Sequence, residues 1–117
     1  MDLKRRFKDF AISVGEFIQL LPKNTINNAY CNQLIRSSSS PGTNYRAALR
    51  GKSAADFINK FKIVEEELDE SIYFLELLQH FNPTKESEIL LLIKEGNELL
   101  AITVASIKTA RLNSAKS

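Results

Sequence analysis

Residues 53–83 read SAADFINKFKIVEEELDESIYFLELLQHFNP and carry the clearest helical pattern in the chain. Large apolar residues recur there every three or four positions, which places them on one face of an α-helix. Ser53 followed by Asp56 resembles a capping box, with Asp in the position more often held by Glu or Gln. Asn82 and Pro83 end the pattern. The sequence therefore predicts one long amphipathic helix with a buried face of Phe57, Phe61, Val64, Leu68, Ile72, Leu75 and Leu78.

Two helices are predicted before this stretch. Apolar residues at helical spacing run from position 3 to position 21 and stop at Pro22. A second helical pattern begins near Thr25 and ends at Gly51, a residue typical of helix C-termini. It is interrupted at residues 37–42, SSSSPG. Because proline inside a helix removes a hydrogen bond and crowds the preceding turn, we expect a kink or a short break there.

A fourth helix is predicted over residues 85–113, again with apolar residues at helical spacing. Four helices joined by short connections fold most simply as an antiparallel up-down-up-down bundle. The length of 117 residues suits a single core. The sequence therefore predicts an all-α, four-helix-bundle domain over residues 1–117 with a kinked second helix.

The composition argues against a secreted or membrane-embedded protein. A single cysteine, Cys31, allows no internal disulfide and suits a reducing compartment. The longest aliphatic run, residues 89–93, is far shorter than the roughly 20 residues that span a bilayer. We expect a cytoplasmic protein.

Residues for catalysis or metal binding are scarce. The single histidine, His80, has Leu77 where a di-iron bundle would place the Glu of its Glu-x-x-His motif. One His and one Cys cannot form a zinc site, and the four glycines form no phosphate-binding loop. We therefore expect no catalytic residues, metal, cofactor or small-molecule substrate.

Charge is distributed unevenly along the predicted bundle. Residues 1–10, 38–62 and 105–117 should share one end, where 12 basic and 3 acidic residues leave a net charge of +9. The remaining residues carry −7, although the whole chain is only +2. Basic residues in the first turn of a helix oppose its macrodipole, so these cations do not serve helix stability. A polyanionic partner would explain them, and so would a solvated end that keeps the protein soluble. The candidate polyanion contacts are Lys4, Arg5, Arg6, Arg50, Lys52, Lys108 and Arg111.

An acidic run on the long third helix faces one arginine of the second. If the two helices are antiparallel around Gly51 and Lys52, Arg36 lies level with Glu67, and Glu66 and Glu70 are one step away. We interpret this as an interhelical ion pair rather than a catalytic site. If the pair is buried, removing one member should cost about 3–5 kcal/mol, because the other charge is left without a partner.

The fourth predicted helix has more apolar positions than one bundle seam requires. The excess indicates a subunit interface, although a more central helix would explain it too. The candidate interface residues are Leu91, Ile102 and Val104.

Residues 33–78 resemble the four-helix-bundle proteins associated with intervening sequences in bacterial 23S ribosomal RNA genes. The resemblance depends on Arg36-Ser37, NYRAA at 44–48, Ser53 with Asp56-Phe57-Ile58, Lys60, and SIYFLELL at 71–78. Many relatives have Trp in place of Phe74 and an Ile-Gly or Val-Gly pair in place of Pro41-Gly42. The resemblance implies a ring-shaped homo-oligomer, most commonly a pentamer, without catalytic residues. Similar bundles serve retroelements by binding reverse transcriptase and nucleic acid.

Two functional hypotheses follow from these observations. In the first, the protein is an oligomeric accessory module that binds RNA or DNA through its basic end. In the second, it is a purely structural or protein-binding oligomer. Binding at the basic end distinguishes them, since phosphate contacts weaken steeply with salt.

Overall fold

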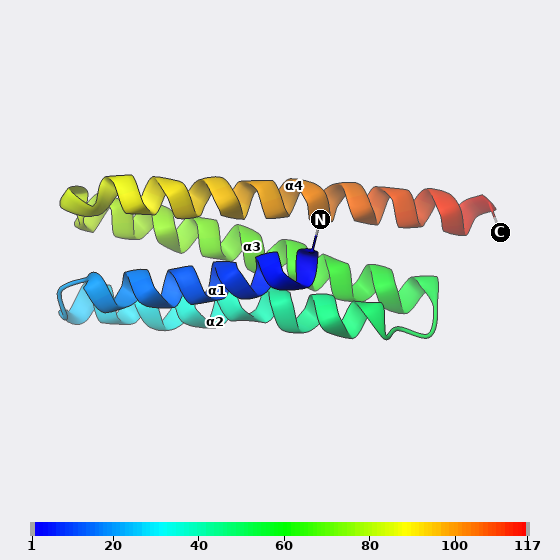
Figure 1. Cartoon of the computed structure of the whole chain (residues 1–117), viewed down its shortest axis with the longest axis horizontal. Coiled ribbons are helices and arrows are strands. Elements are labelled where there is room, and N and C mark those ends of the chain that lie inside the picture. Colours follow the sequence, from blue (N-terminus) through cyan, green and yellow to red (C-terminus); the bar gives the residue numbers. More distant parts are fainter. Residues whose placement is uncertain (1, 117) are drawn as a thin grey trace.

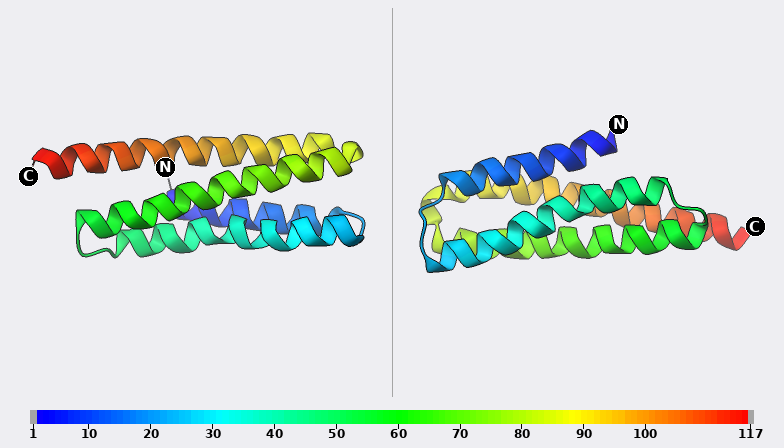
Figure 2. Two further views of the ribbon diagram at one scale, coloured as in Figure 1. Left: turned by 180° about the vertical axis from the view of Figure 1, so that it is seen from behind. Right: turned by 90° about the horizontal axis from the view of Figure 1, so that it is seen from below.

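The computed structural model describes residues 2–116, which form four long α-helices and one short 3-10 helix. The helices are α1 (Leu3–Leu20), α2 (Thr25–Leu49), α3 (Ala54–Phe81) and α4 (Glu86–Lys116), with η1 (Pro83–Lys85) before α4. The all-α, helical-bundle prediction is confirmed. Consecutive helices run in opposite directions (Figures 1 and 2), and the molecule measures 52 × 21 × 19 Å.

Side-chain caps begin the first three helices. The Asp2, Asn24 and Ser53 side chains accept hydrogen bonds from the backbone N–H groups of Arg5, Asn27 and Asp56, at 3.1, 2.8 and 3.1 Å. The predicted Ser53 cap is therefore present. The Asp56 carboxylate in turn accepts a hydrogen bond from the backbone N–H of Lys52 at 3.3 Å, one residue before the donor that a standard capping box uses.

Helix α2 continues without a break through the serine-proline segment, so a full interruption is ruled out. Pro41 is buried, and nearby side chains bond to the backbone: Ser37 Oγ donates to the Leu34 carbonyl at 3.3 Å, and the Asn44 amide donates to the Ser40 carbonyl at 3.0 Å. Packing of α2 between α1 and α3 offsets the local cost of proline. The kink remains a prediction.

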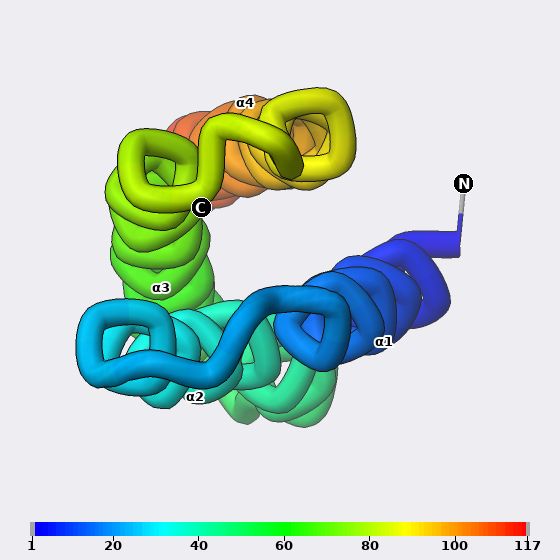
Figure 3. The backbone as a smooth tube through the Cα atoms, turned by 90° about the vertical axis from the view of Figure 1, so that its left-hand side faces the viewer, coloured from blue at the N-terminus to red at the C-terminus, as the bar shows by residue number. Residues whose placement is uncertain are grey.

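Phenylalanine and aliphatic side chains from all four helices form the core. Phe7, Phe10, Val14 and Phe17 of α1 pack against buried Leu, Ile and Val residues of α2, α3 and α4. Viewed from the end, the helices follow one another in chain order round the bundle, with α1 beside α2 and α4 beside α3 (Figure 3). Gly96 of α4 faces this core, where an added Cβ would lie 3.2 Å from Ile72.

Two buried polar pairs join α2 to α3 and its C-cap. Asn27 and Asn82 exchange amide hydrogen bonds of 3.0 and 2.9 Å, and each also donates to a carbonyl of its own neighbourhood. Ser71 Oγ lies 3.0 Å from Ser37 Oγ, between α3 and α2. Among the described residues, no buried side-chain nitrogen or oxygen lacks a hydrogen bond, so these pairs are fully satisfied.

Helix α1 is much shorter than α4, with 18 residues against 31. At 1.5 Å per residue the two helices are about 27 and 47 Å long. Figure 1 shows the N-terminus partway along the molecule, while α2, α3 and α4 continue past it. Residues 2–10 are therefore set back from the end that the sequence assigned to them, and the last part of α4 has no α1 beside it.

Candidate nucleic-acid interface

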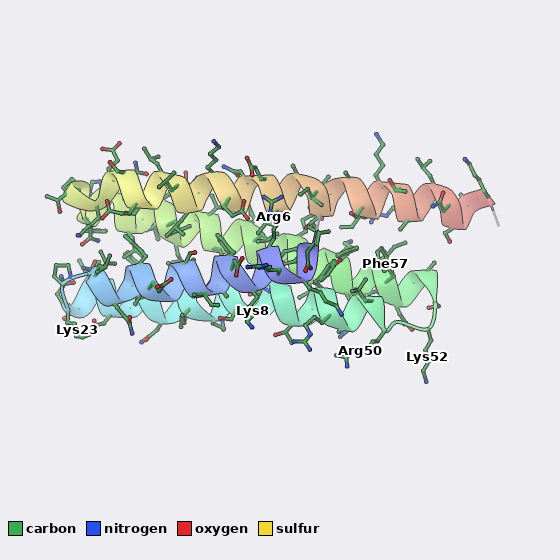
Figure 4. All side chains as sticks on the ribbon, viewed as in Figure 1. Arg6, Lys8, Lys23, Arg50, Lys52 and Phe57 are labelled. Atoms are coloured by element: carbon green, nitrogen blue, oxygen red, sulfur yellow. The ribbon has the colours of Figure 1, made fainter. Side chains whose placement is uncertain are left out.

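Six of the seven predicted polyanion contacts lie exposed on two helices and one turn. Lys4 and Arg5 are exposed in the first turn of α1, Arg50 and Lys52 in the turn between α2 and α3, and Lys108 and Arg111 in the last part of α4. Arg50 and Lys52 project outward where α2 turns into α3, far from Lys23 near the opposite turn (Figure 4). These six predicted contacts are therefore available to a partner.

Arg6, the seventh predicted contact, lies elsewhere. Its guanidinium donates to Glu95 through Nε at 3.0 Å and through a terminal nitrogen at 2.5 Å, and to Glu98 at 3.0 Å. Figure 4 shows Arg6 turned towards α4. The Glu95 hydrogen bond and charge raise the pKa of Arg6 further above its ordinary value. Because two carboxylates already neutralise Arg6, we remove it from the candidate polyanion contacts and assign it to the α1–α4 seam.

A groove between α1 and α2, with a volume of about 630 Å³, gathers further basic residues. Lys4 and Lys8 of α1 and Arg46 of α2 line it, together with hydroxyl-bearing Ser39 and Thr43. We call it the α1–α2 groove. The sequence places Lys8 and Arg46 at the basic end without marking them as contacts. For Lys8, the spacing from Lys4 could have indicated a shared contact surface, because the two residues are one helical turn apart and share a face.

Lys108 and Arg111 belong to a different surface. They line a depression of about 420 Å³ between α3 and α4, together with Glu65 and Val104. The predicted polyanion contacts therefore form separate groups over different helix pairs, and the acid in this depression reduces its positive charge.

The predicted ion pair is present and involves two carboxylates. Arg36 donates to Glu67 at 2.8 Å and also to Glu70, whereas Glu66 is exposed and makes no ion pair with it. The Arg36 side chain is 50% exposed. The pair is therefore a surface feature, and the buried-pair cost of about 3–5 kcal/mol does not apply.

The three candidate interface residues lie on two faces of α4. Ile102 lines a groove of about 760 Å³ between the end of α4 and the start of α3, together with Ala54, Phe57, Ala105 and Thr109. We call it the α3–α4 groove. Leu91, 70% exposed, is 11 positions from Ile102 and shares its face, because three turns take about 11 residues. Val104 is about 200° round the helix from Ile102 and lines the depression that contains Lys108.

The α3–α4 groove exists because α1 is short. Arg6, in the first turns of α1, is level with Glu95 and Glu98, so Ile102 and the residues after it lie beyond the start of α1. Phe57 packs edge-on against Phe61, which contacts Tyr45, which contacts Phe7. The aromatic core thus continues into a region without a fourth helix.

The described part of the chain contains no metal site or membrane segment. No group of three His, Cys, Asp or Glu residues within positions 2–116 is placed to hold a metal ion. None of the helices there combines the length and apolar composition that crossing a membrane requires. Cys31 is buried, and desolvation raises the pKa of its thiol, which disfavours the reactive thiolate.

Two comparisons with known proteins give concordant results. A crystal structure of a protein of unknown function from the S23 ribosomal protein family of Bacteroides thetaiotaomicron superposes with a TM-score of 0.80 at 28% identity. The match covers 90% of this chain and 97% of that one. No curated protein matches the chain. The family model for the 23S rRNA-intervening sequence protein matches residues 1–105, and the chain therefore belongs to that family.

Proposed function

We propose that this protein is a non-enzymatic, homo-oligomeric module that binds RNA or DNA through its exposed basic residues. The observation that carries the proposal is the concentration of exposed cations on α1, the second half of α2 and the α2–α3 turn. Lys4, Lys8, Arg46, Arg50 and Lys52 make no ion pair within residues 2–116. Unpaired surface cations are the electrostatic requirement for phosphate binding.

Oligomerisation would strengthen such binding. A closed ring repeats each basic surface around one axis, and several weak contacts then act together on one polymer. The uncovered α3–α4 groove supports an oligomer, because Phe57 and Ile102 there present apolar surface next to a core that lacks its fourth helix. A pentamer is the form that we expect.

Titration of labelled structured RNA and duplex DNA at two salt concentrations tests the proposal. We expect binding at low salt and a linear fall of log K with log salt, because each phosphate contact releases counterions. Replacing Arg50 and Lys52 with Gln should weaken binding and lower the salt slope by about 1 for each cation that no longer meets a phosphate. Lys23→Gln combined with Lys94→Gln removes the same charge outside these surfaces and should change neither quantity.

The alternative is a purely structural or protein-binding oligomer. The α3–α4 groove favours this alternative, since its lining residues are apolar or uncharged. An oligomer that binds neither RNA nor DNA at low salt would establish this alternative and exclude the first proposal. A reverse transcriptase is then the class of protein partner to test.

A further inference from the structure

The α1–α2 groove differs from the depression that contains Lys108 and Arg111, because both of its walls carry phosphate donors whereas the α3 wall of that depression carries Glu65. Lys4 and Lys8 stand one turn apart on the α1 wall. Ser39, Thr43 and Arg46 follow one another at three- and four-residue spacing on the α2 wall. Ammonium, hydroxyl and guanidinium groups are the side chains that commonly contact phosphate oxygens. Both walls therefore offer phosphate donors to an anion between them.

The acidic residues at this groove are already engaged. Asp2 accepts a hydrogen bond from the Arg5 backbone N–H at 3.1 Å and caps α1. Asp9 lies 3.7 Å from the Arg5 guanidinium, one turn away on the same helix. Lys4, Lys8 and Arg46 have no carboxylate partner in the part of the chain that the structure describes. Asp2 and Asp9 keep their negative charge, so the four cations that line the groove, Lys4, Arg5, Lys8 and Arg46, exceed its acids by two.

We propose that the α1–α2 groove binds the sugar-phosphate backbone of single-stranded nucleic acid in preference to a duplex. The inference rests on the proposed function and specifies the form of polyanion that this surface prefers. Side chains one helical turn apart are about 5–6 Å apart at Cβ, close to the separation of neighbouring phosphates along an extended strand. Lys4 and Lys8 therefore contact successive phosphates.

The dimensions and lining of the groove favour one strand. Helices in direct contact lie about 8–10 Å apart between axes, so the α1–α2 groove is a narrow crease on the surface. A flexible single strand can follow such a crease, whereas a stiff duplex can touch only its rim. Ile12, 48% exposed, extends the α1 wall with an apolar surface for a sugar or base. The groove has no exposed aromatic ring among its lining residues, so it reads no base by stacking and is tolerant of sequence.

Competition between two probes tests the inference. The probes are a labelled single strand of about 12 nucleotides, within the usual range of single-strand site sizes, and a duplex of the same length. Lys8→Gln combined with Arg46→Gln should weaken single-strand binding about tenfold and leave duplex binding changed by less than about threefold. Its salt slope on the single strand should fall by about 1.4, since each phosphate contact contributes about 0.7.

A second pair of substitutions is the charge-matched comparison. Lys108→Gln combined with Arg111→Gln removes the same charge from the depression that contains Glu65 and Val104. This pair should weaken binding of the two probes to the same extent. The groove assignment is overturned, while polyanion binding stands, if the ratio of single-strand loss to duplex loss is the same for the Lys108/Arg111 pair as for the Lys8/Arg46 pair. Absence of binding to either probe at low salt overturns both proposals.

A neutral substitution separates groove filling from charge. Thr43 is exposed on the α2 wall, so Thr43→Met narrows the groove without altering the charge and without adding an aromatic ring on which a base could stack. We expect this variant to lose about tenfold in single-strand affinity and to keep its duplex affinity. Circular dichroism and the thermal midpoint verify that it is folded. A folded Thr43→Met variant with full single-strand affinity contradicts the proposal.

Discussion

Arg36 joins α2 to α3 through Glu67 and Glu70, with half of its side chain in solvent. Exposed ion pairs contribute about 0–1 kcal/mol, because water screens the attraction and two long side chains lose freedom. We expect Arg36→Met to lower the free energy of unfolding by about 1 kcal/mol or less. Urea denaturation measures the change. A decrease above about 3 kcal/mol would mean that the pair is desolvated in solution.

The residue pairing was predictable, but its burial was not. Antiparallel register around the α2–α3 turn needs only residue numbers, and it placed Arg36 level with Glu67. Exposure depends on the rotation of each helix about its axis, which the sequence pattern of α2 leaves poorly determined around its serine-proline segment. Ser37, directly after Arg36, faces the core, and that orientation turns Arg36 to the edge of the seam.

At the scale of elements, α1 meets α4 through Arg6. Its side chain is 26% exposed and donates hydrogen bonds to both Glu95 and Glu98, so we expect it to contribute more to stability than the half-exposed Arg36 does. We expect Arg6→Met to cost about 1–2 kcal/mol of stability. Amide hydrogen exchange should quicken along α1 before it does in α3, because α1 loses its tie to α4.

Arg5→Met is the matched control for this prediction. Arg5 is the preceding residue of α1, but its side chain is 79% exposed and lies 3.7 Å from Asp9 of the same helix. The Arg5→Met variant should leave α1 exchange unchanged. Equal effects of the two variants would mean that helix α1 depends on its N-terminal charge rather than on the α4 carboxylates.

The elements also show what local sequence patterns can and cannot predict. All four helices followed from apolar periodicity and end signals, because burial of one face dominates helix formation in proteins. Pro41 suggested a break, yet α2 is continuous, since packing against two neighbours outweighs the local effect of one residue. The carboxylate partners of Arg6 lie 89 and 92 residues away in the sequence. They are level with Arg6 because α1 begins partway along α4. The sequence therefore grouped Arg6 with the exposed cations.

At the scale of the whole molecule, the unequal lengths of α1 and α4 have two consequences. Residues 2–10 lie beside the second half of α2, so their cations and Arg46 of α2 line one groove. The same shortening leaves the last part of α4 and the start of α3 without a fourth helix. The basic α1–α2 groove and the apolar α3–α4 groove thus both follow from the short α1.

The last prediction concerns that uncovered surface. Ile102 is half-buried in the α3–α4 groove, and a carboxylate there would be desolvated without a partner in an assembled oligomer. Ile102→Glu should therefore reduce the oligomer to a monomer of 13.2 kDa that keeps its helical circular dichroism. Light scattering coupled to size-exclusion chromatography at micromolar concentration measures the mass. Val104→Glu makes the same change about 200° away, so dissociation by Val104→Glu alone would place the interface on the opposite face.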